Sequence, residues 1–227
     1  MPLTTKKILI AMTSHATKGS TGQPTGAYVP EIAHPYDVFT RAGFEVGFAS
    51  VKGGRVPLDG IDRNDALSLP FLDDGPLARR LHDSTPSASV DPSKYAAILF
   101  AGGHGTMWDF PDDAGFQRVA AAIHDAGGVV GAVCHGPAAL VNLRLASGDY
   151  LVAGRDVAGF TNEEERLAKL VDVVPFLLED RLVARGAVFR GAAPWQRHVV
   201  TSGRLVTGQN PASAAGVAEA MVRVLVE

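Results

Sequence analysis

Residues 95–101, YAAILFA, form a run in which the hydroxyl of Tyr95 is the only polar side-chain group. A strand with one wet face would alternate apolar and polar residues, whereas this run is apolar almost throughout. Such a run is typical of a strand that is buried on both faces of a sheet. It therefore predicts a sheet with structure packed on either side.

The rest of the chain alternates strand-like apolar runs with helical patterns. Lys7–Met12 and residues 45–49 are predicted as strands, and residues 28–42 as mostly helical with a break near Pro35. This alternation indicates an α/β fold with a doubly wound, mostly parallel sheet and helices on both faces. Further elements are expected as helices at 116–126 and 163–170, paired strands at 198–201 and 204–207, and a last helix with Asn210 as N-cap and Pro211 at its first position.

Composition restricts the class of protein. The chain has 227 residues, of which 46% are hydrophobic and 20% charged, with a net charge of −3, and so has no basic surplus for nucleic acid or a membrane surface. We expect a single domain over 1–227, with a loop region or insertion at 51–92, which is rich in Gly, Pro, Asp and Ser. One cysteine excludes an internal disulfide framework, and the apolar run at 8–12 is too short for a signal-peptide core. A cytoplasmic location is expected.

The only cysteine, Cys134, stands between an apolar strand-like run and a helix-forming stretch, in GVVGAVCHGPAAL at 128–140. This order is typical of a nucleophile elbow, which places a side chain at a helix N-terminus where a thiolate is favoured. His135 offers an imidazole and an amide, Gly136 permits a close approach, and Pro137 suits a first helical turn. An isolated cysteine is more often a small buried hydrophobe, but this context favours a reactive one.

A glycine-rich turn, AGGHGT at 101–106, follows the YAAILFA run. Glycines permit conformations that point amides at an anion, so Gly102, Gly103 and the amide of His135 are a candidate oxyanion site. The alternative is a tight turn that only requires positive φ angles. His104 is expected to line the same pocket. The other histidines show no paired metal-ligand spacing, so no metal is expected.

Five segments in order resemble the superfamily of the Parkinsonism-associated deglycase and the PfpI protease, in its heat-shock-protein-31-like, or glyoxalase III, branch. They are 26–31 (GAYVPE), 101–111 (AGGHGTMWDFP), 132–137 (AVCHGP), 158–165 (AGFTNEEE) and 205–213 (LVTGQNPAS). The resemblance implies a flavodoxin-like sandwich that is commonly a homodimer. Glutamine amidotransferases are distant relatives with a His-x-Glu pair near the C-terminus, but here His198 is followed by Val-Val, which argues against glutaminase chemistry.

The resemblance also implies a Cys-His-acid site. Cys134 corresponds to the nucleophile, His135 to its partner, Glu31 to a carboxylate beside the sulfur, and Glu165 to the acid that orients the histidine. The alternative role of Glu165 is structural, because Asn162 followed three residues later by Glu165 is a capping-box pattern.

The activity that the resemblance implies is a glyoxalase without cofactor, which converts methylglyoxal, a small reactive dicarbonyl, to lactate. Cys134 would form a hemithioacetal, and either Glu31 or His135 would move the proton. Two alternatives use the same fold: a cysteine-dependent hydrolase (deglycase, amidase or peptidase) and a stress chaperone. No nucleic-acid or membrane partner is expected.

Overall fold

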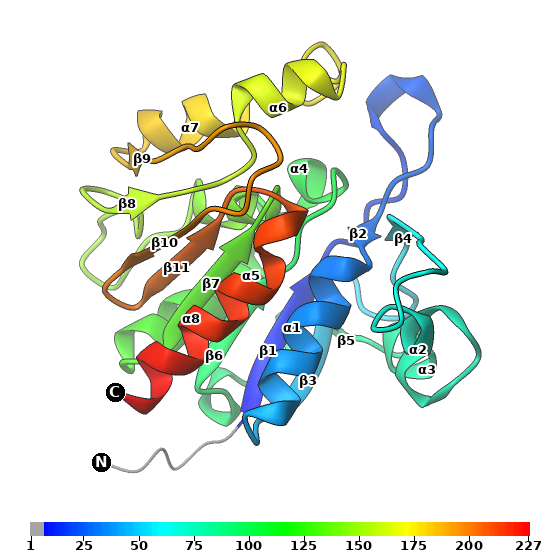
Figure 1. The fold of residues 1–227 in the computed structure, drawn as a ribbon. Helices are drawn as coiled ribbons and strands as arrows, with labels where there is room; N and C mark the ends of the chain where they lie inside the picture. Colours follow the sequence, from blue (N-terminus) through cyan, green and yellow to red (C-terminus); the bar gives the residue numbers. More distant parts are fainter. Residues whose placement is uncertain (1–6) are drawn as a thin grey trace.

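A computed structural model describes residues 7–227, which are built around one seven-stranded sheet (Figure 1). The strand order is β10-β11-β7-β6-β1-β3-β5, and every neighbouring pair is parallel except β10 with β11. The strands are β1 (Lys7–Met12), β3 (Glu45–Ser50), β5 (Thr85–Pro86), β6 (Ala97–Phe100), β7 (Val129–Val133), β10 (Val199–Ser202) and β11 (Leu205–Gly208). The predicted α/β fold with a mostly parallel sheet is confirmed. Residues 1–6, which the sequence assigns to the same domain, lie outside the described residues.

Helices cover the two faces of the sheet. α1 (Pro30–Arg41) and α8 (Ala214–Val226) pack side by side on one face, and α5 (Ala114–Asp125) packs on the other (Figure 1). The side chains of β6 between them are fully buried, as the YAAILFA run predicts. The core therefore lies in two layers, one on each side of the central strands.

The remaining elements are short. β2 (Ala27–Tyr28) pairs with β4 (Leu58–Asp59), and β8 (Asp156–Val157) pairs with β9 (Val188–Phe189). The other helices are α2 (Leu69–Leu72), α3 (Pro76–His82), α4 (Thr106–Asp109), α6 (Asn162–Leu167) and α7 (Leu178–Ala184), with 3-10 turns η1 (Gly19–Thr21), η2 (Ser87–Ser89), η3 (Pro92–Lys94), η4 (Gly136–Leu140) and η5 (Pro211–Ser213). The segment 51–92 is more than a loop, because it supplies the edge strand β5.

The break predicted near Pro35 is wrong, and the start of the last helix differs from the prediction. α1 continues through Pro35, since Ile32 and Phe39 are buried on either side of it and hold the helix against the core. Asn210 and Pro211 hold the predicted N-cap and first positions, but of the turn η5, and α8 begins only after this turn, at Ala214. The side chain of Asn210 makes no cap hydrogen bond to the backbone, and its Nδ2 donates to Oε1 of Glu164 at 2.8 Å.

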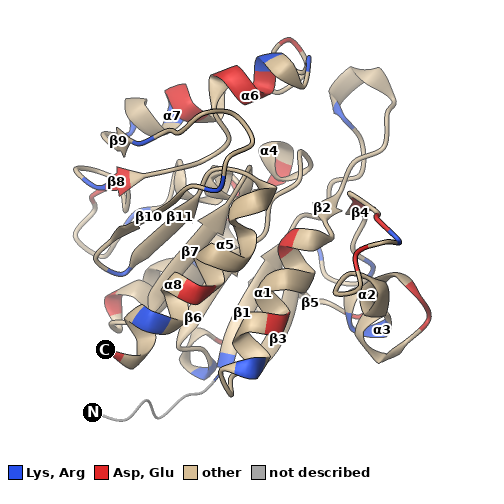
Figure 2. Cartoon of the chain, viewed as in Figure 1, with Lys and Arg blue, Asp and Glu red and all other residues tan. Residues whose placement is uncertain are grey.

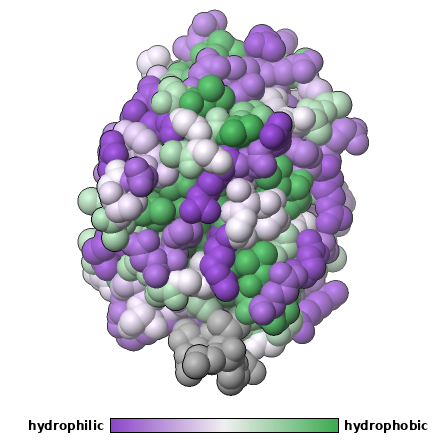
Figure 3. All heavy atoms as spheres, turned by 90° about the vertical axis from the view of Figure 1, so that its left-hand side faces the viewer, coloured by the Kyte–Doolittle hydropathy of each residue, from purple (hydrophilic) through white to green (hydrophobic). Residues whose placement is uncertain are grey.

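The surface carries charged residues of both signs and scattered hydrophobic residues. Acidic and basic residues are interspersed over the outer helices and loops (Figure 2). On the face drawn in Figure 3, hydrophobic residues reach the surface in several areas between hydrophilic ones. Among residues 7–227, no helix has both the length and the apolar character that a membrane span requires.

Candidate active site

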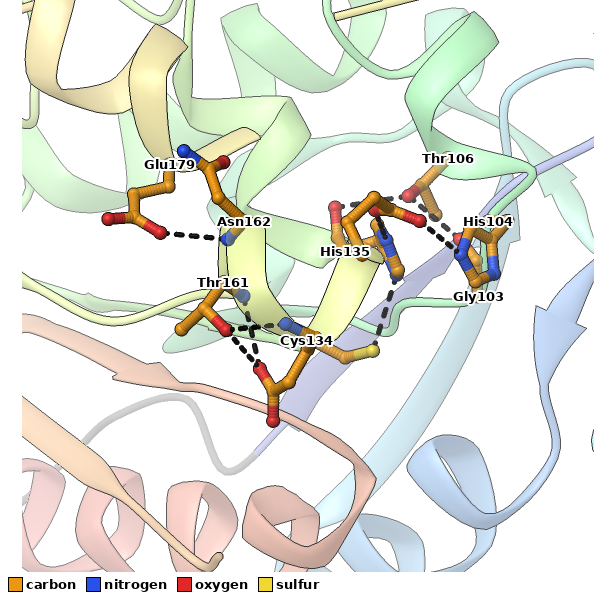
Figure 4. A network of polar contacts seen from close by, with 10 residues as sticks. Gly103, His104, Thr106, Cys134, His135, Thr161, Asn162 and Glu179 are labelled. Carbon is orange, nitrogen blue, oxygen red and sulfur yellow. Dashed lines mark hydrogen bonds and ion pairs between the residues drawn. The ribbon is translucent and has the colours of Figure 1, made fainter. Parts of the chain in front are cut away.

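Cys134 directly follows β7, at the carboxyl edge of the sheet (Figure 4). Its φ of 59° lies in the left-handed region, which residues other than glycine seldom adopt. A Cβ at Gly136 would overlap the carbonyl oxygen of Phe100, so the predicted close approach is confirmed. The predicted helix is shorter than expected, because Gly136–Leu140 forms a single 3-10 turn, η4, whose dipole is weaker than that of an α-helix.

His135 lies between the sulfur and a carboxylate. Sγ of Cys134 is 3.4 Å from Nδ1 of His135 (Figure 4). Nε2 of His135 is 2.8 Å from Oε2 of Glu165. Because an ionised carboxylate only accepts hydrogen bonds, Nε2 carries the proton and Nδ1 presents its lone pair to the sulfur. Burial, reinforced by the nearby His104, lowers the pKa of His135 to about 4. The imidazole is therefore neutral at pH 7 and able to accept the thiol proton.

Glu165 does not belong to a capping box. The N-cap of α6 is Thr161, whose hydroxyl accepts from the amide of Glu164, and the carboxylate of Glu164 accepts from the amide of Thr161, both at 3.0 Å. The predicted box of Asn162 and Glu165 is thus displaced by one residue. Glu165 is left to face the histidines. Burial would raise its pKa, but hydrogen bonds from His104 and His135 hold that pKa at about 2.

Glu31 comes from the first turn of α1 and is fully buried. Its Oε2 accepts a hydrogen bond of 2.7 Å from the amide of Gly102, while its Oε1 is buried without a partner among the described residues. Burial raises the pKa of Glu31 to about 8, against a smaller lowering effect of the Gly102 amide and the nearby Cys134 thiol. Glu31 is accordingly a protonated acid at pH 7, next to the sulfur.

The ionisation of Cys134 differs from the sequence-based expectation. Burial raises the pKa of the thiol above its ordinary value, and the charge of an ionised Glu31 would raise it further, whereas the amide of His135 lowers it. The elbow therefore does not hold a resting thiolate. It holds a neutral thiol that can pass its proton to Nδ1 of His135 as the sulfur attacks.

The glycine turn lies beside the sulfur, but its residues differ in whether their N–H groups are free to bind an oxyanion. The amide of Gly102 donates to Oε2 of Glu31 at 2.7 Å, so it could serve an oxyanion only if this hydrogen bond were broken. The amide of Gly103 has no acceptor within residues 7–227 and stays available, together with the amide of His135. The imidazole of His104 is directed at Glu165, with Nε2 3.0 Å from Oε1, and this contact was not predicted.

Two further neighbours were missed from the sequence. The ring of Phe160 packs against His135, with 4.2 Å between ring centroids. Oε1 of Glu164, on α6, accepts hydrogen bonds from the backbone amide of Trp195 and the side-chain amide of Asn210. The only sequence signal for either was its place in the AGFTNEEE segment.

His104, His135 and Glu165 also bear on the expectation that no metal binds. One ligand-type atom from each lies within 4.8 Å of the others, an arrangement of nitrogen and oxygen donors that a divalent ion could accept. In this structure Nε2 of each histidine instead hydrogen-bonds to an oxygen of Glu165.

A doubly wound sheet with a buried cysteine on an elbow, and a histidine and two carboxyl groups around it, defines a DJ-1-type fold with a thiol site. The chain belongs to the DJ-1/PfpI family, whose family model matches residues 26–224.

The relatives agree over nearly the full length. Glyoxalase 3 of Candida albicans is 36% identical, covering 95% of this chain and 97% of the relative. Glutathione-independent glyoxalase HSP31 of Saccharomyces cerevisiae is 34% identical, covering 92% and 93%. The crystal structure of the rapid encystment protein REP24 of Francisella tularensis superposes with a TM-score of 0.93 at 39% identity, covering 97% and 99%.

Proposed function

We propose that this protein is a glutathione-independent glyoxalase that converts methylglyoxal to lactate without a cofactor. The names of its full-length relatives support this activity. The observation that carries the proposal is the pairing of Cys134 with two different proton carriers, the neutral imidazole of His135 and the buried, protonated carboxyl of Glu31.

The first step is addition of the thiol to the aldehyde. His135 takes the proton of Cys134 at Nδ1, and the sulfur bonds to C1 of methylglyoxal. The oxygen charge that develops faces the amides of Gly103 and His135. Glu31 enters the reaction protonated and gives its proton to this oxygen, which completes a hemithioacetal and leaves Glu31 as a carboxylate.

The second step moves a proton between carbons. The Glu31 carboxylate removes the proton from C1 and returns it to C2, while the hydroxyl proton on the C1 oxygen passes to the C2 oxygen. Together these transfers convert the hemithioacetal into a lactoyl thioester on Cys134. Water then cleaves the thioester, and the sulfur regains the proton held by His135. One proton of the water returns to Glu31, and the other leaves to solvent as lactate is released. In this scheme Glu165 stabilises the imidazolium and Glu31 is the base at carbon, so the two candidate bases of the sequence have separate tasks.

The test is lactate formation from methylglyoxal by the purified protein with no glutathione present, with Cys134→Ala as control. We expect turnover by the wild-type protein and none by the variant. Release of an amine or acid from glycated or peptide substrates in place of lactate would favour the hydrolase reading. Suppression of aggregation that survives in Cys134→Ala, without any turnover, would favour the chaperone reading.

A homodimer in the cytoplasm is part of this proposal and rests on the family resemblance. Light scattering of the purified protein gives its mass in solution. A mass of about one chain at micromolar concentration would contradict the dimer.

A further inference from the structure

One carboxylate in this site serves two imidazoles. Nε2 of His104 lies 3.0 Å from Oε1 of Glu165, and Nε2 of His135 lies 2.8 Å from Oε2. The side chain of Glu165 is 3% exposed and that of His135 is 1% exposed, while that of His104 is 17% exposed. Each oxygen of the buried carboxylate therefore has its own histidine.

The proton positions follow from this geometry. An ionised carboxylate has no hydrogen to donate, so both imidazoles donate from Nε2. The Nε2 proton of His104 is used by Glu165 and cannot serve an oxyanion at Cys134. A neutral His104 can offer the pocket only the lone pair of Nδ1, which is an acceptor. In its neutral form His104 therefore has no proton to give an oxyanion while this hydrogen bond stands.

The segment around His104 packs closely against its neighbours. Gly103 has a φ of 98°, and a Cβ there would overlap the carbonyl of Gly26. The hydroxyl of Thr106 lies 3.0 Å from the carbonyl oxygen of His135 and 2.9 Å from that of Gly103, so it links the two segments that carry the histidines. The rings of His104 and His135 are in contact, with centroids 4.0 Å apart.

We propose that His104 is a positioning residue, which holds Glu165 by Oε1 so that Oε2 keeps the ring of His135 directed at Cys134. Glu165 stands on the six-residue helix α6, and among residues 7–227 its carboxylate has hydrogen-bond donors only in the two histidines. Without His104, Oε1 is left buried and unsatisfied, and the carboxylate can rotate away from His135. The inference rests on the proposed function, since it assigns His135 as the acceptor of the thiol proton.

Three substitutions separate a positioning role from other roles. His104→Gln places an amide N–H where Nε2 was and can still reach Glu165, whereas His104→Phe keeps a ring without the donor. His104→Asn carries the same amide on a shorter side chain that does not reach. His15→Gln is the matched control, because His15 stacks on Trp108 and makes no contact with Glu165.

Two readouts are measured for each variant. One is kcat and KM for lactate formation from methylglyoxal, and the other is the rate of alkylation of Cys134, the only cysteine, by iodoacetamide at a fixed pH. We expect His104→Phe and His104→Asn to lower kcat about tenfold or more, with KM changed by less than about twofold, and to slow alkylation in parallel. His104→Gln should keep kcat within about threefold of the wild-type value, as should His15→Gln.

A double variant tests whether His104 acts only through Glu165. If His104 acts only through Glu165, His104→Phe combined with Glu165→Gln should be no slower than Glu165→Gln alone. A rise in KM with kcat unchanged would make His104 a substrate contact, and independent losses in the double variant would give it a role of its own. Either result, or a wild-type rate in His104→Phe, overturns the inference. Alkylation needs no glyoxalase turnover, so absent lactate with the predicted alkylation pattern would refute the proposed function alone.

Discussion

The charge state of Glu31 can be tested through protein stability. The substitution is Glu31→Gln, which keeps the shape of the side chain and an oxygen for the amide of Gly102. Burial raises the pKa of Glu31 from its ordinary 4.5 to about 8, and each pKa unit corresponds to about 1.36 kcal/mol, so the ionised form is disfavoured in the fold by about 5 kcal/mol. This figure is an upper bound, because local opening admits water to an ionised carboxylate.

The sign follows from proton binding. Between pH 4.5 and 8 the folded protein keeps the proton that the unfolded chain has lost, so the wild type loses stability as pH rises through this range. Glu31→Gln has no such proton. We expect the free energies of unfolding of the two proteins to differ by no more than about 1 kcal/mol at pH 4.5. Relative to the wild type, the free energy of unfolding of the variant should then rise by about 1.4 kcal/mol per pH unit up to pH 8.

The assay is urea unfolding of both proteins at several pH values between 4.5 and 8, analysed as the difference between their free energies of unfolding. Other titrating groups are common to both proteins and cancel in this difference. The same series in a Cys134→Ser background removes the thiol that is coupled to Glu31. A difference that does not change with pH would refute the reasoning, since Glu31 would then be ionised in the fold at neutral pH.

Three further predictions concern the elbow and α6. Cys134→Ser should keep the fold, judged by its circular dichroism, and retain less than about 1% of kcat/KM, because the hydroxyl is a far weaker nucleophile; substantial turnover would contradict covalent catalysis. Glu165→Gln should lower kcat by about tenfold or more with little change in Tm, whereas Glu164→Gln should lower the free energy of unfolding by about 1–2 kcal/mol and spare kcat; the opposite pattern would restore the capping role to Glu165. Gly136→Ala should destabilise the protein by at least about 2 kcal/mol in urea unfolding, because the added Cβ meets the carbonyl of Phe100; an unchanged midpoint would contradict the close approach.

Much of the fold could be predicted from the sequence because strands and helices leave local periodic patterns. The YAAILFA run indicated a strand buried on both faces, and the alternation of patterns indicated a doubly wound sheet. The elbow at Cys134 and the close approach at Gly136 were also local, since each depends on the few residues around the turn. The assignment of Glu31 came only from the family resemblance, because nothing in its neighbours distinguishes it from a solvated helix residue.

What only the tertiary structure decided depends on burial and on partners distant in the chain. Pro35 did not break α1 because packing against the core outweighed the lost hydrogen bond, and the hydrogen bond of Asn210 with Glu164 joins residues 46 positions apart. The contact of His104 with Glu165 joins residues 61 positions apart, so no local pattern could contain it. The proton on Glu31 and the neutral thiol of Cys134 arise from removal of water around both groups. A sequence lists the ionisable groups, but the enclosure that sets their charge exists only once the chain has folded.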